Sequence, residues 1–254
     1  MLRTRVIPCL LLNDESLVKT VKFGAYTYIG DPVNTVRIFN ELEVDELVFL
    51  DITASRHSRG PNFKVLEDIA NECFMPLAYG GGICDIEDVG RIFGIGFEKV
   101  VINSHAVQDP GFIRRVADKF GSQSVIGSID ARKNLFGRYE VFTHGGTKKA
   151  SGNPLEWAQE LERLGAGELL LTSMDRDGTW AGFDIKLTAS VTSKVQVPVI
   201  ANGGAGTVRH IGDVVGRGGA SAVAVGSLVV FQGKGLGVLV NFPGKKELEE
   251  VLPR

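Results

Sequence analysis

The sequence is poor in the residues that mark secreted, metal-binding or nucleic-acid-binding proteins. Its 254 residues include three cysteines, Cys9, Cys73 and Cys84, which cannot all pair with one another and lack metal-ligand spacing. The net charge is only −2, so no general affinity for nucleic acid is expected. These features favour a protein of the reducing cytosol, and we expect no metal and no cofactor.

Long apolar runs and low-complexity linkers are also missing. The longest apolar run near the end, AVAVGSLVVF at 222–231, is too short to cross a bilayer. The apolar run near the N-terminus is too short for a signal peptide. No Pro/Ser-rich stretch divides the chain, so we expect one domain over residues 1–254 and no membrane contact.

The chain instead alternates short apolar runs with amphipathic segments. Near-continuous apolarity is typical of parallel strands covered on both faces. Strands are predicted at Arg5–Leu11, Glu46–Asp51, Pro76–Tyr79, Lys99–Ile102, Ser124–Asp130, Glu168–Thr172, Val197–Ala201 and Ala222–Val225. Helices are predicted at Pro32–Leu42, Pro61–Cys73, Ile86–Phe93, Pro110–Phe120, Pro154–Leu164, Ile185–Ser193 and Val208–Arg217. Eight such units predict a (β/α)8 TIM barrel, with a doubly wound open sheet as the rival.

A duplication favours the barrel over the open sheet. The stretch from Met75 to Ser104 is repeated by the stretch from Val197 to Ser227, and the paired glycines lie 122 residues apart, as with Gly82 and Gly204. An open sheet would not need a second copy of these turns. We therefore predict two half-barrels, at about 1–122 and 123–254.

Both copies place small residues where a strand ends and a helix begins, which is where backbone N–H groups bind phosphate well. A lone glycine turn would be only a tight turn, but two related copies suggest a phosphorylated small molecule with two phosphates. The candidate phosphate-binding residues are Gly82, Asn103 and Ser104 in one half, and Asp177, Gly178, Gly204, Gly226 and Ser227 in the other.

Acidic residues at strand ends are the candidates for proton transfer, because active sites of such barrels lie at the C-terminal ends of the strands. Asp130 ends the fifth predicted strand and is expected to point into the barrel mouth. Its partner position at the end of the first strand is Leu11, which cannot carry a proton. Asp51, Asp175 and Asp177 could equally cap helices or bind hydroxyl groups.

The segment Leu12–Gly30 has poor helical period and is long for a plain connection. It carries two lysines, Lys19 and Lys22, with interleaved aromatic residues. It is either a mobile surface loop or, as we favour, a lid over a substrate.

A third pattern lies at the opposite end of the predicted barrel. Two bases and two acids stand at or near the starts of strands one, two, four and six: Arg5, Glu46, Lys99 and Glu168. They could form a ring that closes the barrel bottom, and in most barrels such a ring is structural.

The motifs IPCLL, GDP, DELVFLDITAS, GGGI, FGSQ, IDA, GAGELLLTSMDRDGT, ANGGAG and VGS resemble, in register, the cyclase subunit of imidazole glycerol phosphate synthase. The resemblance covers almost the whole chain and weakens after about Phe231. It implies a duplicated (β/α)8 barrel that receives ammonia from a partner glutaminase at the N-terminal face. It makes the ring an ammonia gate, Lys19 a lid residue, Asp130 one of two catalytic aspartates, and the glycine turns phosphate sites, with Ser104 in place of the usual threonine.

The sequence departs from that family at Leu11, which stands where the second catalytic aspartate is usual, and in the lid sequence VKTVKF. Losing one proton-transfer group should cost about 10²–10⁴ in rate. These departures resemble a side branch associated with surface polysaccharides. That resemblance implies supply of ammonia to a separate sugar amidotransferase, which converts an acetamido group to an acetamidino group. The alternatives are a cyclase of histidine biosynthesis that tolerates Leu11, and a non-catalytic scaffold that activates a glutaminase.

Overall fold

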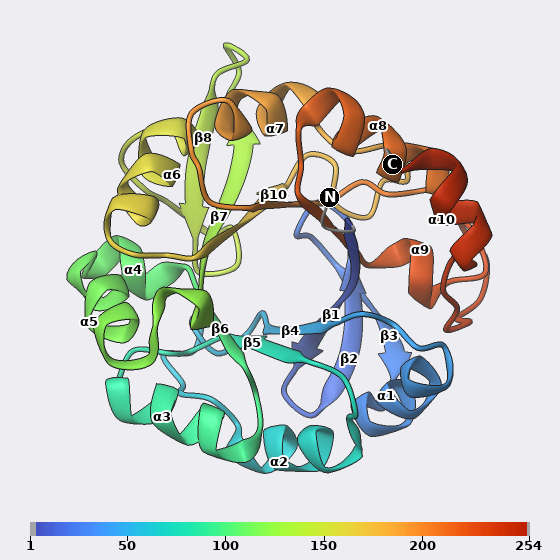
Figure 1. Ribbon diagram of the computed structural model, residues 1–254, viewed down its shortest axis with the longest axis horizontal. Coiled ribbons are helices and arrows are strands. Elements are labelled where there is room, and N and C mark those ends of the chain that lie inside the picture. Colours follow the sequence, from blue (N-terminus) through green and yellow to red (C-terminus); the bar gives the residue numbers. More distant parts are fainter. Residues whose placement is uncertain (1–3, 253–254) are drawn as a thin grey trace.

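The centre of the fold is a closed ring of parallel strands, described here over residues 4–252 by a computed structural model (Figure 1). The ring strands are β1 (Arg5–Asn13), β4 (Leu47–Asp51), β5 (Leu77–Gly80), β6 (Lys99–Ile102), β7 (Val125–Lys133), β10 (Glu168–Ser173), β11 (Val199–Asn202) and β12 (Ala222–Val225). Each pairs in parallel with the next, and pairings of β7 with β10 and of β12 with β1 complete the circle. The predicted (β/α)8 barrel is confirmed, and the open sheet is excluded.

Helices surround the strands on the outside of the ring (Figure 1). They are α1 (Pro32–Glu41), α2 (Phe63–Glu72), α3 (Ile86–Ile95), α4 (Ser104–Gln108), α5 (Gly111–Phe120), α6 (Pro154–Arg163), α7 (Ile185–Thr192), α8 (Val208–Gly218), α9 (Ser227–Val230) and α10 (Lys245–Val251). Within residues 4–252, no helix has the length and apolarity to cross a membrane.

Short-range capping fixes where several helices begin and end. The Asp31 carboxylate accepts a hydrogen bond from the Asn34 N–H at the start of α1, and proline follows it at the first helical position. The helix predicted to end at Arg217 runs one residue further, to Gly218. Gly219 ends that helix in the left-handed conformation, at φ 68°.

Alternate strand residues divide the apolar core in two. One set packs against the helices, and includes Val6, Phe49 and Leu169. The other set contains strand residues alone, among them Ile7, Val48, Ala78, Ile126 and Leu170, and fills the inside of the ring. This inner cluster separates the two ends of the barrel.

The segment Leu12–Gly30, predicted to be either a mobile surface loop or a lid, forms a hairpin, and its role as a lid stays a prediction. β1 continues past the ring and pairs antiparallel with β2 (Ser16–Thr20), which pairs with β3 (Tyr26–Gly30). The physical reason is local, because Leu17 and Val18 are both buried and Asp14 adopts the left-handed backbone that turns the chain, at φ 58°.

A similar extension follows in the second half, where the sequence predicted none. β7 also continues past the ring and pairs antiparallel with β8 (Tyr139–Thr143), which pairs with β9 (Lys148–Lys149). The β7–β8 hairpin extends beyond the ring of helices in Figure 1. Both hairpins rise from the same end of the barrel, where β1 and β7 outrun their neighbours. The proposed division into half-barrels remains a prediction, and its outer bounds include residues 1–3 and 253–254, which lie outside the described range.

Candidate active site

A cavity of about 310 Å³ lies at the C-terminal ends of the strands. Its lining brings together residues from both halves of the chain, including Leu11, Lys19, Asn103, Asp130 and Asp177. A parallel barrel places the last residues of all its strands around one mouth, so residues far apart in sequence meet there. The size is that of a small-molecule site.

Asp130 lies at the floor of this cavity. The Asn103 side-chain N–H donates to Asp130 Oδ2 at 2.9 Å. Burial raises the pKa of the Asp130 carboxyl to about 7; hydrogen bonds from Thr172 and Asn103 oppose the rise, and the charge of Asp177 adds to it. A carboxyl group that titrates near neutral pH can both accept and donate a proton at that pH.

Leu11 forms an apolar part of the same lining. It is 8% exposed and lies beside Leu50 of β4 and Val18 of β2 in the sheet register. The position that the sequence paired with Asp130 therefore faces the cavity, and its side chain is a hydrocarbon.

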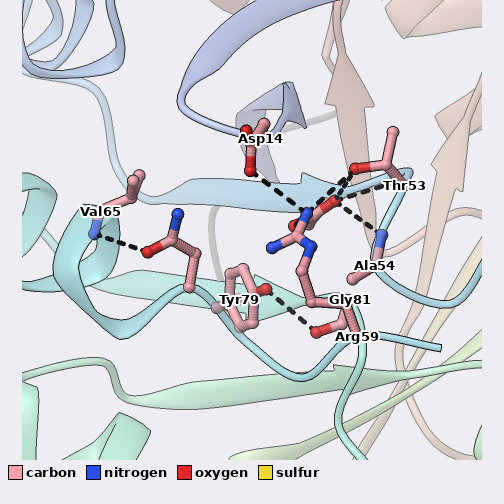
Figure 2. Close-up of polar contacts among 9 residues, drawn as sticks. Asp14, Thr53, Ala54, Arg59, Val65, Tyr79 and Gly81 are labelled. Atoms are coloured by element: carbon pink, nitrogen blue, oxygen red, sulfur yellow. Dashed lines mark hydrogen bonds and ion pairs between the residues drawn. The ribbon is translucent and has the colours of Figure 1, made fainter. Parts of the chain in front are cut away.

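Two of the other candidate acids have structural partners. Asp51 accepts hydrogen bonds from the N–H groups of Thr53 and Ala54, both at 2.9 Å, and from Arg59 Nη2 at 3.0 Å. Figure 2 shows Arg59 held between Asp14 and Thr53, close to Gly81. Asp175 accepts from the Lys133 N–H at 2.9 Å. The donors lie in the loop after β4 and at the end of β7, so neither of these carboxylates caps a helix.

The first predicted phosphate turn opens into the cavity. Gly81 and Gly82 have φ of 134° and 70°, and a Cβ on Gly82 would lie 2.3 Å from the Arg59 carbonyl oxygen. Only glycine fits such a turn. Tyr79 Oη donates to the Gly81 carbonyl at 3.0 Å (Figure 2). Ser104 lines the same part of the cavity, and its hydroxyl accepts from the His144 N–H at 2.9 Å.

The second predicted turn is covered. A space of only about 10 Å³ remains between Asp177, Gly178, Gly204, Gly226 and Ser227. The side chain that covers it is Lys19, whose Nζ lies 3.3 Å from Asp177 Oδ1 and 2.6 Å from where a Cβ on Gly226 would stand. Thr20 Oγ1 donates to the other carboxylate oxygen of Asp177 at 2.7 Å. The hairpin thus reaches over this turn.

At the other end of the barrel, the four predicted charges form a closed ring of alternating sign. Arg5 contacts Glu46 through Nη1 and Glu168 through Nη2, the latter at 2.8 Å. Lys99 Nζ lies 3.0 Å from Glu46 and 2.9 Å from Glu168. The pKa of Arg5 is raised, because the two glutamates outweigh the opposing effect of burial. The Glu46 side chain is only 3% exposed, so the ring is a partly desolvated network.

The interior between ring and cavity is apolar. It is lined by small or aliphatic side chains such as Ile7, Ala78, Ala222 and Ala224, with the Cys9 thiol beside them. Burial raises the pKa of that thiol to about 12, so it stays neutral. Within residues 4–252, no three His, Cys, Asp or Glu side chains are grouped as metal ligands.

Three loops meet at the cavity in a way that the sequence did not predict. Phe23 from the β2–β3 turn packs against Gly146, and Arg56 from the β4–α2 loop lies against Gly145. Gly145 and Gly146 both have positive φ, which lets the turn before β9 accept these side chains. The double glycine in THGGT was the only signal, and it gave no hint of its partners.

Comparisons with known proteins agree with this architecture. A family model described as "Histidine biosynthesis protein" matches residues 5–234. A Pseudomonas aeruginosa protein named "Putative imidazole glycerol phosphate synthase subunit hisF2" is 54% identical over 249 residues, covering 98% of this chain and 99% of its own. A Leptospira borgpetersenii protein named "Putative imidazole glycerol phosphate synthase subunit HisF" is 46% identical over the full length of both chains. A Vibrio vulnificus protein whose name ends in "hisF3" is 44% identical, covering 99% of this chain and 97% of its own.

Proposed function

The chain belongs to the histidine biosynthesis protein family, and from this premise we propose that it is a synthase subunit that conducts ammonia through its barrel. The observation that carries the proposal is the closed ring of Arg5, Glu46, Lys99 and Glu168 at one end of an apolar interior. The apolar side chains that fill the barrel lie between these four charges and the ligand-sized cavity, so ammonia that passes the charged ring would cross a layer without charged groups.

The proposed partner is a glutaminase that docks at the N-terminal face of the barrel. Ammonia released there is small and uncharged, so it could cross an apolar interior. The charged ammonium ion would be excluded from that interior. Passage requires the ring to part, and the Lys99 contacts with Glu46 and Glu168 are the candidates because a lysine side chain is long and flexible.

For the acceptor, we propose a sugar in surface polysaccharide synthesis. A separate amidotransferase would form a bond from the ammonia nitrogen to the acetamido carbon and release the carbonyl oxygen as water, which gives an acetamidino group. Leu11 supports this reading, since the cavity then has Asp130 without a second carboxyl at the partner position. The barrel would keep the gate and the passage without a complete pair of acids for ring closure.

The runner-up function is the cyclase of histidine biosynthesis, which forms imidazole glycerol phosphate from a bisphosphate substrate and ammonia. The pKa of Asp130 near 7 and the open Gly81–Gly82 turn favour it. The third alternative is a non-catalytic activator of a glutaminase. The complete charged ring argues against it, because an activator that passes no ammonia needs no gate.

An ammonia-dependent cyclisation assay decides between the first two functions. Free ammonia replaces the partner, and the wild-type protein is compared with Leu11→Asp and with Leu11→Asn, which matches the size of aspartate without its acid. We expect a silent wild type, a gain in Leu11→Asp and no gain in Leu11→Asn. Robust wild-type turnover would instead establish the cyclase.

A second experiment tests the passage itself. In the complex with the glutaminase, Lys99→Met should raise the ammonia released to solvent per molecule of aminated product. The control is Lys64→Met, which removes an exposed lysine from the first turn of α2, away from the ring. An unchanged ratio in Lys99→Met would reject conduction through the barrel.

A further inference from the structure

Arg56 stands at the mouth of the cavity without an acidic partner. It is exposed and lines the cavity from the β4–α2 loop. Its Nη2 donates to the Gly145 carbonyl, and its Nε donates to the His144 carbonyl at 3.3 Å. Within residues 4–252 no carboxylate forms an ion pair with it, so its full charge faces two neutral oxygens.

The loop that carries Arg56 is fixed at its base. Asp51 accepts from the N–H groups of Thr53 and Ala54 and from Arg59, so the chain on both sides of Arg56 is tied to the end of β4 (Figure 2). The Arg59 carbonyl oxygen also lies only 2.3 Å from where a Cβ on Gly82 would stand, so the loop packs against the first phosphate turn. The loop therefore holds its place, and the Arg56 side chain is the part that can reorient.

His144 links Arg56 to Ser104 of the first predicted phosphate site. His144 donates its N–H to the Ser104 hydroxyl at 2.9 Å, and its carbonyl accepts from Arg56. The guanidinium and the hydroxyl thus hold the two backbone polar groups of the same residue. Both line the cavity, together with Gly82 and the imidazole rings of His105 and His144.

The charges around this end of the cavity favour an anion. Asp51, the last residue of β4 before this loop, forms an ion pair with Arg59 and accepts from two backbone N–H groups. Asp177 is paired with Lys19 at the far side. Arg56 is thus the cation at this mouth whose charge no carboxylate in the described chain offsets.

We propose that Arg56 binds the outer oxygens of a phosphate group seated on the Gly81–Gly82 turn, exchanging the carbonyls of His144 and Gly145 for the ligand. A guanidinium offers a planar pair of N–H donors that matches two phosphate oxygens, and it prefers a charged acceptor to a neutral carbonyl. The ligand class is a phosphate monoester that enters the cavity with its phosphate at the β5–β6 side. This inference rests on the phosphate site predicted at this turn and on the bisphosphate substrate of the runner-up function.

The test is calorimetric titration with ribulose 1,5-bisphosphate, a linear bisphosphate used as the probe. We expect Arg56→Gln to weaken binding about tenfold, and Arg56→Lys to weaken it less, because lysine keeps the charge and loses the paired donors. Raising ionic strength should weaken wild-type binding more than Arg56→Gln binding. Arg217→Gln on the outer face of α8 is the control and should bind as the wild type does.

Unfolding midpoints without ligand separate binding from a merely structural role. Arg56→Gln should unfold close to the wild-type midpoint, since its side chain is exposed. If Arg56→Gln binds the probe as tightly as the wild type, the inference is overturned while the phosphate site stands. If the wild type binds neither this probe nor millimolar inorganic phosphate, the phosphate-binding proposal fails and the role of Arg56 falls with it.

Discussion

Replacing Asp130 with asparagine should stabilise the protein at neutral and alkaline pH. Burial raises the pKa of this carboxyl to about 7 in the folded protein, against about 3.9 in an unfolded chain. The folded state therefore binds the proton more tightly, and wild-type stability falls as pH rises from about 4 to about 7. Asparagine has the same shape and carries no charge, so it avoids this loss.

The magnitude follows from the shift. A difference of about three pKa units corresponds to about 4 kcal/mol in the free energy of unfolding above pH 7. Because the carboxylate is partly open to the cavity, where water enters, we expect about half of this, roughly 2 kcal/mol. The hydrogen bond from Asn103 survives, since the amide oxygen of asparagine accepts as the carboxylate does.

The assay is urea unfolding of both proteins at pH 5, 6, 7 and 8. The advantage of Asp130→Asn should be smallest at pH 5 and grow to about 2 kcal/mol at pH 8, or about 4–8 °C in melting temperature for a chain of this size. A constant difference across this range would refute the reasoning. Direct titration of the Asp130 carboxyl by NMR would then locate the error.

Further substitutions test the charged ring, the glycine turns and a helix cap. Lys99→Met should cost about 3–5 kcal/mol in urea unfolding, because it leaves Glu46 and Glu168 to share the single positive charge of Arg5 in a partly desolvated network. Adding Glu168→Gln should recover at least half of that loss, and no recovery would contradict a shared network. Gly204→Ala should destabilise by more than 2 kcal/mol, because φ is 110° and its Cβ would lie 2.3 Å from a backbone oxygen. Gly226→Ala should cost less than about 1 kcal/mol, because its Cβ meets only the end of a flexible side chain, and equal melting temperatures for the two variants would refute the contrast. Asp31→Ala should lower the free energy of unfolding by about 1 kcal/mol through loss of the α1 cap, and an unchanged urea midpoint would show that the cap contributes nothing.

The barrel could be predicted because its signals are local and repeated. Apolar runs alternate with segments that open on cap residues, as Asp31 does for α1, and Gly82 and Gly204 occupy equivalent turns. The hairpins could not be predicted in the same way. Leu17 and Val18 make too short an apolar pattern to indicate a strand, and β2 exists because it pairs with an extended β1.

The site divides along a similar line. The charged ring follows from position alone, because residues at the starts of neighbouring strands must meet. Contacts between loops do not follow from sequence position, because nothing in the sequence indicates which loop crosses the mouth of the cavity. The covering of the second phosphate turn by Lys19 and the meeting of Arg56 with Gly145 belong to this second kind.

The two phosphate turns differ in access, and this difference sets an order of events. A ligand with a phosphate at each end meets a free turn at Gly82 and one already covered by the Lys19–Asp177 pair. Its first phosphate can bind as fast as ligand and protein diffuse together. Its second phosphate can bind only after Lys19 has left Asp177. Such a ligand would bind in two kinetic phases, the first faster at higher ligand concentration and the second limited by the motion of a single lysine.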